Sequence, residues 1–143
     1  MFGQDRQQLR QFFHNVWAKM QTGETLSPLE MVVAEVIKKH PEYHAIFNKP
    51  EQVDRDYFVE AGETNPYLHM ALHISLHEQI ITDRPAGIRT LYQQLVAKTG
   101  DAHKCEHLMM ECLAESLWQA QRDQQPPSDE FYLAALQKLL QSR

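Results

Sequence analysis

The sequence predicts an all-α protein on the basis of three observations. Apolar residues recur at helical spacing along most of the chain, and a proline or a capping residue precedes most of these segments. No run alternates apolar and polar residues as a half-buried strand would. The 143 residues, 43% of them hydrophobic, are enough for one core. We therefore expect a single compact domain over residues 1–143, built as a bundle of about six helices.

The first predicted helix carries apolar residues at the i, i+3, i+4, i+7 spacing of one buried face. These residues are Leu9, Phe12, Phe13, Val16, Trp17 and Met20, and the turn at residues 21–24 follows them. His14 falls off this apolar face. We therefore expect His14 to be solvated.

The second predicted helix begins with a capping signal. Ser27 precedes Pro28, and Glu30 follows at the position that completes a capping box, so Glu30 is expected to cap its own helix rather than act as a ligand. The helix should end near His40, where Pro41 interrupts it. His40 and His44 are expected to be turn and packing residues.

Residues 45–64 show no periodicity, which predicts an irregular loop that covers a site or a stretch that contains a short helix. Four more helices follow, each opened by a capping residue or a proline. Their start signals are Asn65-Pro66, Asp83-Arg84-Pro85, Asp101 and Ser128. The first three should end near Ile81, Thr99-Gly100 and Arg122.

Charge and composition exclude several function classes. The formal net charge is -5 and no basic stripe is present, so we expect no nucleic-acid partner. The N-terminus lacks a signal-peptide h-region and no apolar run approaches the ~18 residues of a membrane span, so we expect a cytoplasmic protein with no membrane contact.

Cys105 and Cys112 are expected to be small buried apolar side chains in a reducing compartment. No Gly-rich phosphate loop is present, and we expect no nucleotide cofactor.

The most informative feature is a pair of histidine runs at four-residue steps, which is about one helical turn. The first run consists of His69, His73 and His77, and the second of His103, His107, Glu111 and Glu115. A helical wheel places the first run in the middle of an apolar face, and the second run also faces inward. Buried imidazoles destabilise a fold unless each finds a partner, so the two runs need an explanation.

Helix order suggests that the two runs meet. If the helices that carry them are parallel, His69 and His73 lie level with His103 and His107, with Glu111 one turn deeper. Such a cage suits zinc, iron or manganese, and these five residues are the candidate metal ligands. His69 and His77 are separated by about 12 Å of helix rise, so one metal cannot bind both.

His77 and Glu115 are therefore expected beside the ligands of a single metal rather than among them. The alternative is that two metals are bound. A third alternative contains no metal, and there Glu30, Glu111 and Glu115 hydrogen-bond the histidines in a structural polar network.

Several segments resemble a known family over nearly the whole chain. They are His40-Pro41-Glu42-Tyr43-His44, Thr64-Asn65-Pro66-Tyr67-Leu68-His69, Asp83-Arg84-Pro85-Ala86-Gly87-Ile88-Arg89, Gly100-Asp101-Ala102-His103 and Trp118-Gln119-Ala120-Gln121-Arg122. Their order and spacing resemble an uncharacterised bacterial family known as domain of unknown function 1841. The resemblance implies a small bacterial protein and brings no activity, substrate or ligand set.

Two function hypotheses follow from the residues. In the first, a divalent metal with an open position activates water in a hydrolase-like reaction or binds a small-molecule ligand, with Glu111 or Glu115 as a ligand or general base. In the second, the chain is a non-enzymatic module that binds a protein partner and keeps its histidines in a structural network. The sequence leaves open whether the protein is an enzyme.

Overall fold

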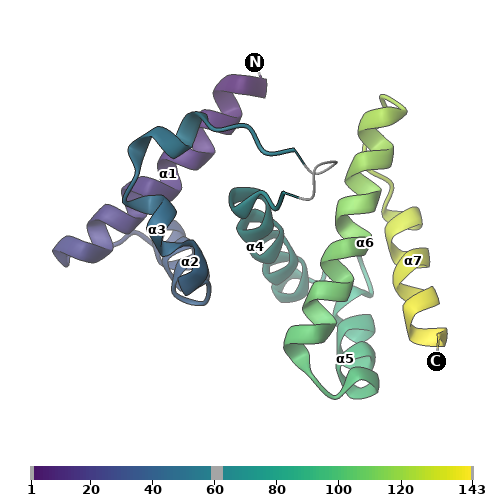
Figure 1. Cartoon of the computed structure of the whole chain (residues 1–143). Coiled ribbons are helices and arrows are strands. Elements are labelled where there is room, and N and C mark those ends of the chain that lie inside the picture. The colour runs from purple at the N-terminus through teal and green to yellow at the C-terminus, as the bar shows by residue number, and fades with distance from the viewer. Residues whose placement is uncertain (1, 59–62, 143) are drawn as a thin grey trace. The chain divides into compact units, whose positions relative to one another are not determined.

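The computed structural model describes residues 2–58 and 63–142, and it describes the side chains of residues 6–58 and 63–142. Within this part of the chain every regular element is helical, which confirms the all-α prediction (Figure 1). The elements are α1 (Phe2–Thr22), α2 (Pro28–Lys38), η1 (Pro41–Tyr43), α3 (His44–Phe47), η2 (Pro50–Asp54), α4 (Pro66–Thr82), α5 (Ile88–Thr99), α6 (Ala102–Arg122) and α7 (Asp129–Gln141). None of the helices so described is long and apolar enough to cross a membrane.

The chain divides into two compact units at a point within α4. The first unit extends to Ile74 and the second begins at Ser75, so α4 contributes residues to both. The histidines of the first predicted run are divided accordingly: His69 and His73 belong to the first unit and His77 belongs to the second.

The core of the first unit is formed by α1, α2, α3 and the beginning of α4. Its most deeply buried members are Phe13, Val16, Ile37 and Met70, each with no exposed surface. The predicted capping box at the start of α2 is confirmed: the Glu30 N–H donates to Oγ of Ser27, and the Ser27 N–H donates to the Glu30 carboxylate.

Residues 45–64 contain short helices, as the second alternative for this stretch anticipated. They include the end of α3 and all of η2. Arg10 holds η2 against α1, because its Nη1 donates to the carbonyls of Val53 and Arg55 at 3.0 and 2.6 Å. The same guanidinium lies over the rings of Tyr57 and Tyr67, whose faces stabilise its positive charge.

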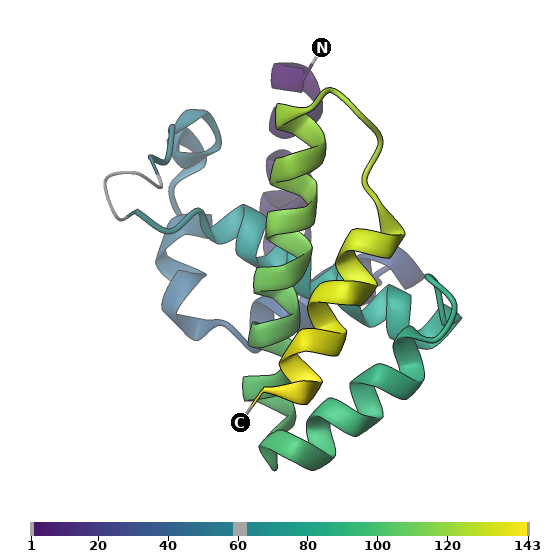
Figure 2. The ribbon, with the colours of Figure 1, turned by 90° about the vertical axis from the view of Figure 1, so that its right-hand side faces the viewer.

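The second unit packs α5, α6 and α7 around a second group of apolar side chains. Figure 2 shows α7 lying along α6, and the two helices are in contact. The predicted caps Asp101 and Ser128 are confirmed, since each side chain accepts a backbone N–H at the start of its helix. Tyr132 of α7 donates from its hydroxyl to Gln79 of α4 at 2.8 Å.

The predicted start of the fourth helix is wrong by several residues. The helix begins at Ile88, after Gly87, whose φ of 96° is easily adopted only by glycine. Asp83 still contributes to the helix start from a distance, because its carboxylate accepts the N–H of Arg89 at 3.0 Å. The N-cap is therefore Gly87 rather than Asp83, although the Asp83 carboxylate still accepts one N–H of the first turn, and the turn before the helix is longer than the sequence pattern indicates.

Candidate metal centre

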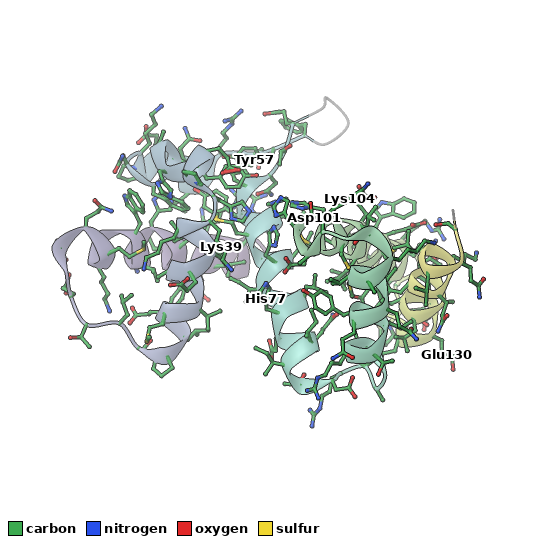
Figure 3. The ribbon with its side chains drawn as sticks, turned by 90° about the horizontal axis from the view of Figure 1, so that it is seen from below. Lys39, Tyr57, His77, Asp101, Lys104 and Glu130 are labelled. Carbon is green, nitrogen blue, oxygen red and sulfur yellow. The ribbon has the colours of Figure 1, made fainter. Side chains whose placement is uncertain are left out.

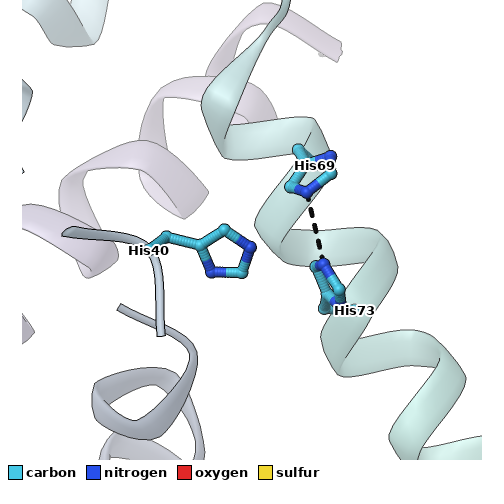
Figure 4. A group of neighbouring side chains, drawn as sticks. All are labelled: His40, His69 and His73. Atoms are coloured by element: carbon cyan, nitrogen blue, oxygen red, sulfur yellow. Dashed lines mark hydrogen bonds between the residues drawn. The ribbon is translucent and has the colours of Figure 1, made fainter. Parts of the chain in front are cut away.

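Three histidines of the first unit come together between the end of α2 and the first turns of α4. Nitrogen atoms of His40, His69 and His73, one from each ring, all lie within 4.8 Å of one another. Figure 4 shows the His40 ring directed toward the two histidines of α4. His40 and His73 are buried, whereas His69 is half-buried. The group is therefore largely shielded from solvent, with its more accessible side at His69.

The two histidines of α4 meet because they are one helical turn apart on one face. Their Nε2 atoms are 3.2 Å apart, and their ring centroids are 4.8 Å apart at an interplanar angle of 74°. Two nitrogens bound to one tetrahedral zinc at roughly 2.0–2.1 Å lie about 3.3–3.4 Å apart. The separation of His69 and His73 thus already matches that of two ligands on one ion.

His40 is held in a defined orientation by its own helix end. Its Nδ1 lies 2.8 Å from the carbonyl oxygen of Val36, which can only accept, so Nδ1 carries the proton and donates. In the neutral ring the lone pair is then on Nε2. A histidine that donates from one nitrogen to a backbone carbonyl and offers the other as a ligand is the usual arrangement in metal sites.

Tyr43 forms one wall of the group. Its ring stacks on His40, with centroids 5.5 Å apart and planes 3° from parallel, and it meets His69 edge-on at 6.1 Å. Burial raises the pKa of Tyr43, so the phenol stays protonated at neutral pH. The wall is therefore uncharged and fixes the His40 ring by packing.

The prediction that His14 is solvated is wrong. The side chain is 7% exposed, because Phe47 of α3 and Tyr67 of α4 cover that side of α1. Burial lowers the pKa of His14, partly offset by a hydrogen bond to the Phe47 backbone. The neutral ring accepts the Tyr67 hydroxyl on Nε2 at 2.7 Å. His14 is thus a satisfied core histidine and takes no part in the three-histidine group.

His44 has the packing role that the sequence predicted. Its Nε2 lies 2.8 Å from the Ile37 carbonyl, and its ring packs against Trp17 at 4.7 Å. His40 also packs and bonds a carbonyl, as predicted, but its place beside His69 and His73 was missed. The available signal was its place one turn after Val36 on the apolar side of the predicted second helix, although the observed α2 ends at Lys38.

The remaining predicted residues lie in the second unit. Nε2 of His77 lies 2.7 Å from the carboxylate of Glu106 of α6, a partner that the sequence did not suggest. His103 and His107 pack edge-on against each other with centroids 4.2 Å apart. Glu111 and Glu115 are exposed, which corrects the inward orientation predicted for them.

The predicted joint site of both histidine runs stays a prediction, because His69 and His73 belong to one unit and the second run belongs to the other.

Comparison with known proteins supplies a family and no activity. A family profile described as "Domain of unknown function (DUF1841)" matches residues 5–138. No curated protein and no solved structure matches the chain. The matched segment covers nearly the whole sequence, which agrees with the resemblance of the quoted motifs. The chain belongs to the DUF1841 family.

Proposed function

We propose that this protein binds one divalent transition-metal ion through His40, His69 and His73. The observation that carries the proposal is the convergence of three imidazole nitrogens within 4.8 Å, two of them 3.2 Å apart. The span is wider than a tetrahedral site requires, so the ring of His40 moves toward the α4 pair when the ion binds. His69 and His73 give up the proton that their hydrogen bond shares, since a ligating nitrogen must be deprotonated.

The ligand set favours zinc over manganese. Imidazole nitrogen suits zinc, iron, copper and nickel, whereas manganese prefers carboxylate and water oxygens. The three-residue group contains no carboxylate. Glu111 and Glu115 are exposed on α6 of the second unit. The site proposed here uses neither of them as a metal ligand or as a general base.

Three histidines leave one position open on a four-coordinate ion. Structural zinc sites in proteins use four protein ligands, whereas three ligands and a water are typical of catalytic sites. The half-buried His69 is the accessible edge of the group, from which a water or a small anionic ligand can reach that position. We accordingly propose a site that binds or activates a small molecule, of the kind used in metal-assisted hydrolysis.

The competing function is a metal-free protein-interaction module. Its support is that histidines elsewhere in the first unit are structural: His14 bonds Tyr67, and His44 bonds the Ile37 carbonyl. In that case the hydrogen bond between His69 and His73 is simply part of a polar network. The two functions differ in whether the histidines bind a metal ion when a chelator competes for it.

Zinc titration of tag-free protein against a chromophoric chelator separates them. Wild-type protein should withdraw one equivalent of zinc, and His73→Ala should lose that binding because only two ligands remain. His77→Ala is the matched control: it removes a histidine from the same helix, one turn further on, whose contact is Glu106. It should retain full zinc binding.

Circular dichroism of each variant establishes that the helices are intact. Failure of wild-type protein to compete for zinc, or equal loss in His73→Ala and His77→Ala, would overturn the proposal.

A further inference from the structure

A small cavity lies where the end of α6 meets the start of α7, within the second unit. Its volume is about 100 Å³. Pockets that enclose a drug-sized ligand measure roughly 300–1,000 Å³, so this cavity takes only a small molecule or one edge of a larger one. Five polar residues and one aromatic residue contribute to its lining: Ser116, Gln119, Asp123, Gln125, Ser128 and Phe131.

The cavity is formed by the way the chain turns between the two helices. The N–H of Gln125 donates to the carbonyl of Ala120 at 2.9 Å, and Gln124 has a φ of 55°, which together make a Schellman motif at the end of α6. Ser128 then caps α7 by accepting the Phe131 N–H at 3.1 Å. The walls therefore come from residues that are close in sequence and are held by backbone hydrogen bonds.

Ser116 places a buried hydroxyl on this cavity. The residue is 4% exposed and belongs to the buried side of α6. Within residues 2–58 and 63–142, no group forms a hydrogen bond with its hydroxyl, which lines the cavity. A buried hydroxyl without a partner destabilises a fold. A molecule bound in the cavity supplies the missing partner.

The other uncharged polar groups of the lining can both donate and accept hydrogen bonds. Gln119 and Gln125 each offer a carboxamide, which has two N–H donors and an acceptor oxygen. The hydroxyl of Ser128 accepts the bond that caps α7 and keeps its own proton to donate. The cavity thus suits a ligand whose groups also donate and accept.

The charges around the cavity disfavour an anion. The Asp123 carboxylate lines it and lies 3.1 Å from Nε of Arg122, which partly balances its charge. Asp129 and Glu130 add negative charge in the first turn of α7, where Figure 3 shows Glu130. A phosphate or carboxylate ligand would therefore meet carboxylates at a helix start that otherwise attracts anions.

We propose that this cavity binds a small neutral polyhydroxyl molecule, such as a three-carbon polyol or the edge of a sugar. Hydroxyl groups donate and accept in turn, as the lining does, whereas an ammonium group only donates. Phe131 offers apolar surface to the C–H groups of such a ligand. The proposal does not rest on metal binding by the three-histidine group, because every residue it uses lies between positions 116 and 131.

NMR titration of the full-length protein tests the proposal with glycerol, glucose, methylammonium and inorganic phosphate as probes. Glycerol or glucose should give saturable shifts of the backbone amides of residues 116–131, and the two ions should not. Ser116→Ala and Gln119→Ala should each weaken binding about fivefold, as expected for one lost hydrogen bond. Gln137→Ala is the matched control, an exposed glutamine of α7 outside the lining, and should keep the wild-type affinity.

Ser116→Ala also separates lost binding from lost folding. Alanine favours the helix and removes a hydroxyl that has no partner, so the free energy of unfolding should not fall. A fall would overturn the assignment of an unbonded hydroxyl. Polyol shifts that never saturate, or equal affinities in Ser116→Ala and Gln137→Ala, would overturn the site, and saturable binding of methylammonium or phosphate instead would overturn the ligand class.

Discussion

Removal of the Tyr67 hydroxyl tests the account of the buried histidines. Tyr67 and His14 are 2% and 7% exposed, and the phenol oxygen is 2.7 Å from Nε2 of the imidazole. Tyr67→Phe keeps the ring, its edge contacts with Phe13 and Phe47 and its place beneath Arg10, so only the hydroxyl is lost. The change leaves a buried acceptor on His14 with neither water nor protein to bond it.

An unsatisfied buried polar group costs about 1–3 kcal/mol, and we expect Tyr67→Phe to lower the free energy of unfolding by that amount. Urea denaturation followed by circular dichroism measures it. Tyr57→Phe is a matched control, because its hydroxyl is 3.5 Å from Gln52 and only part-buried. That control should lose less than about 0.5 kcal/mol. Equal losses in the two variants would refute the assignment of a buried, satisfied His14.

Three further predictions follow from local contacts. Burial lowers the pKa of His14, so the imidazole binds a proton more readily in the unfolded protein than in the folded protein. The free energy of unfolding of the wild-type protein should therefore fall as the pH drops below about 6.5, the ordinary histidine pKa, and it should fall less in His14→Leu. Burial raises the pKa of Cys105 to about 11 and also raises that of Cys112, so at pH 8 a thiol reagent should label native protein far more slowly than denatured protein. Ser27→Ala removes the α2 cap and should lower the free energy of unfolding by about 1 kcal/mol, measured by urea denaturation.

Features that depend on neighbouring residues in the chain were predictable from the sequence. The caps at Ser27, Asp101 and Ser128 lie where expected because each bonds a backbone N–H two or three residues away. The inward position of His73 also followed from the helical wheel. Helix existence and helix starts therefore needed little tertiary information, apart from the Gly87 turn before α5.

Features that depend on contacts between distant segments were not predictable. His14 is at the edge of the apolar face of α1, and it is buried because Phe47 and Tyr67, which are distant in sequence, pack against it. His40 lies beyond the last residue of α2, where helical spacing no longer indicates direction. Its approach to His73 is set by how α2 and α4 pack, which the sequence periodicity of either helix cannot specify.

The same reasoning explains Glu111 and Glu115. Both were placed inward by the helical wheel, which grouped them with His103 and His107 on one side of the helix. In the structure the buried side of α6 is formed by Cys105, Met109, Met110, Leu113 and Ser116. The two carboxylates fall on the solvent side, where a charged group keeps its hydration.

The ligand set of bound zinc is the most direct test of the central claim. X-ray absorption spectroscopy of the one-equivalent zinc complex, in protein that carries His103→Ala/His107→Ala, counts the imidazoles on the ion. Binding through His40, His69 and His73 predicts three imidazole nitrogens at roughly 2.0–2.1 Å and a fourth ligand, a water oxygen, that carries no imidazole ring. A protein that holds no zinc after removal of excess metal, or a spectrum with fewer than three imidazoles, would contradict the three-histidine site.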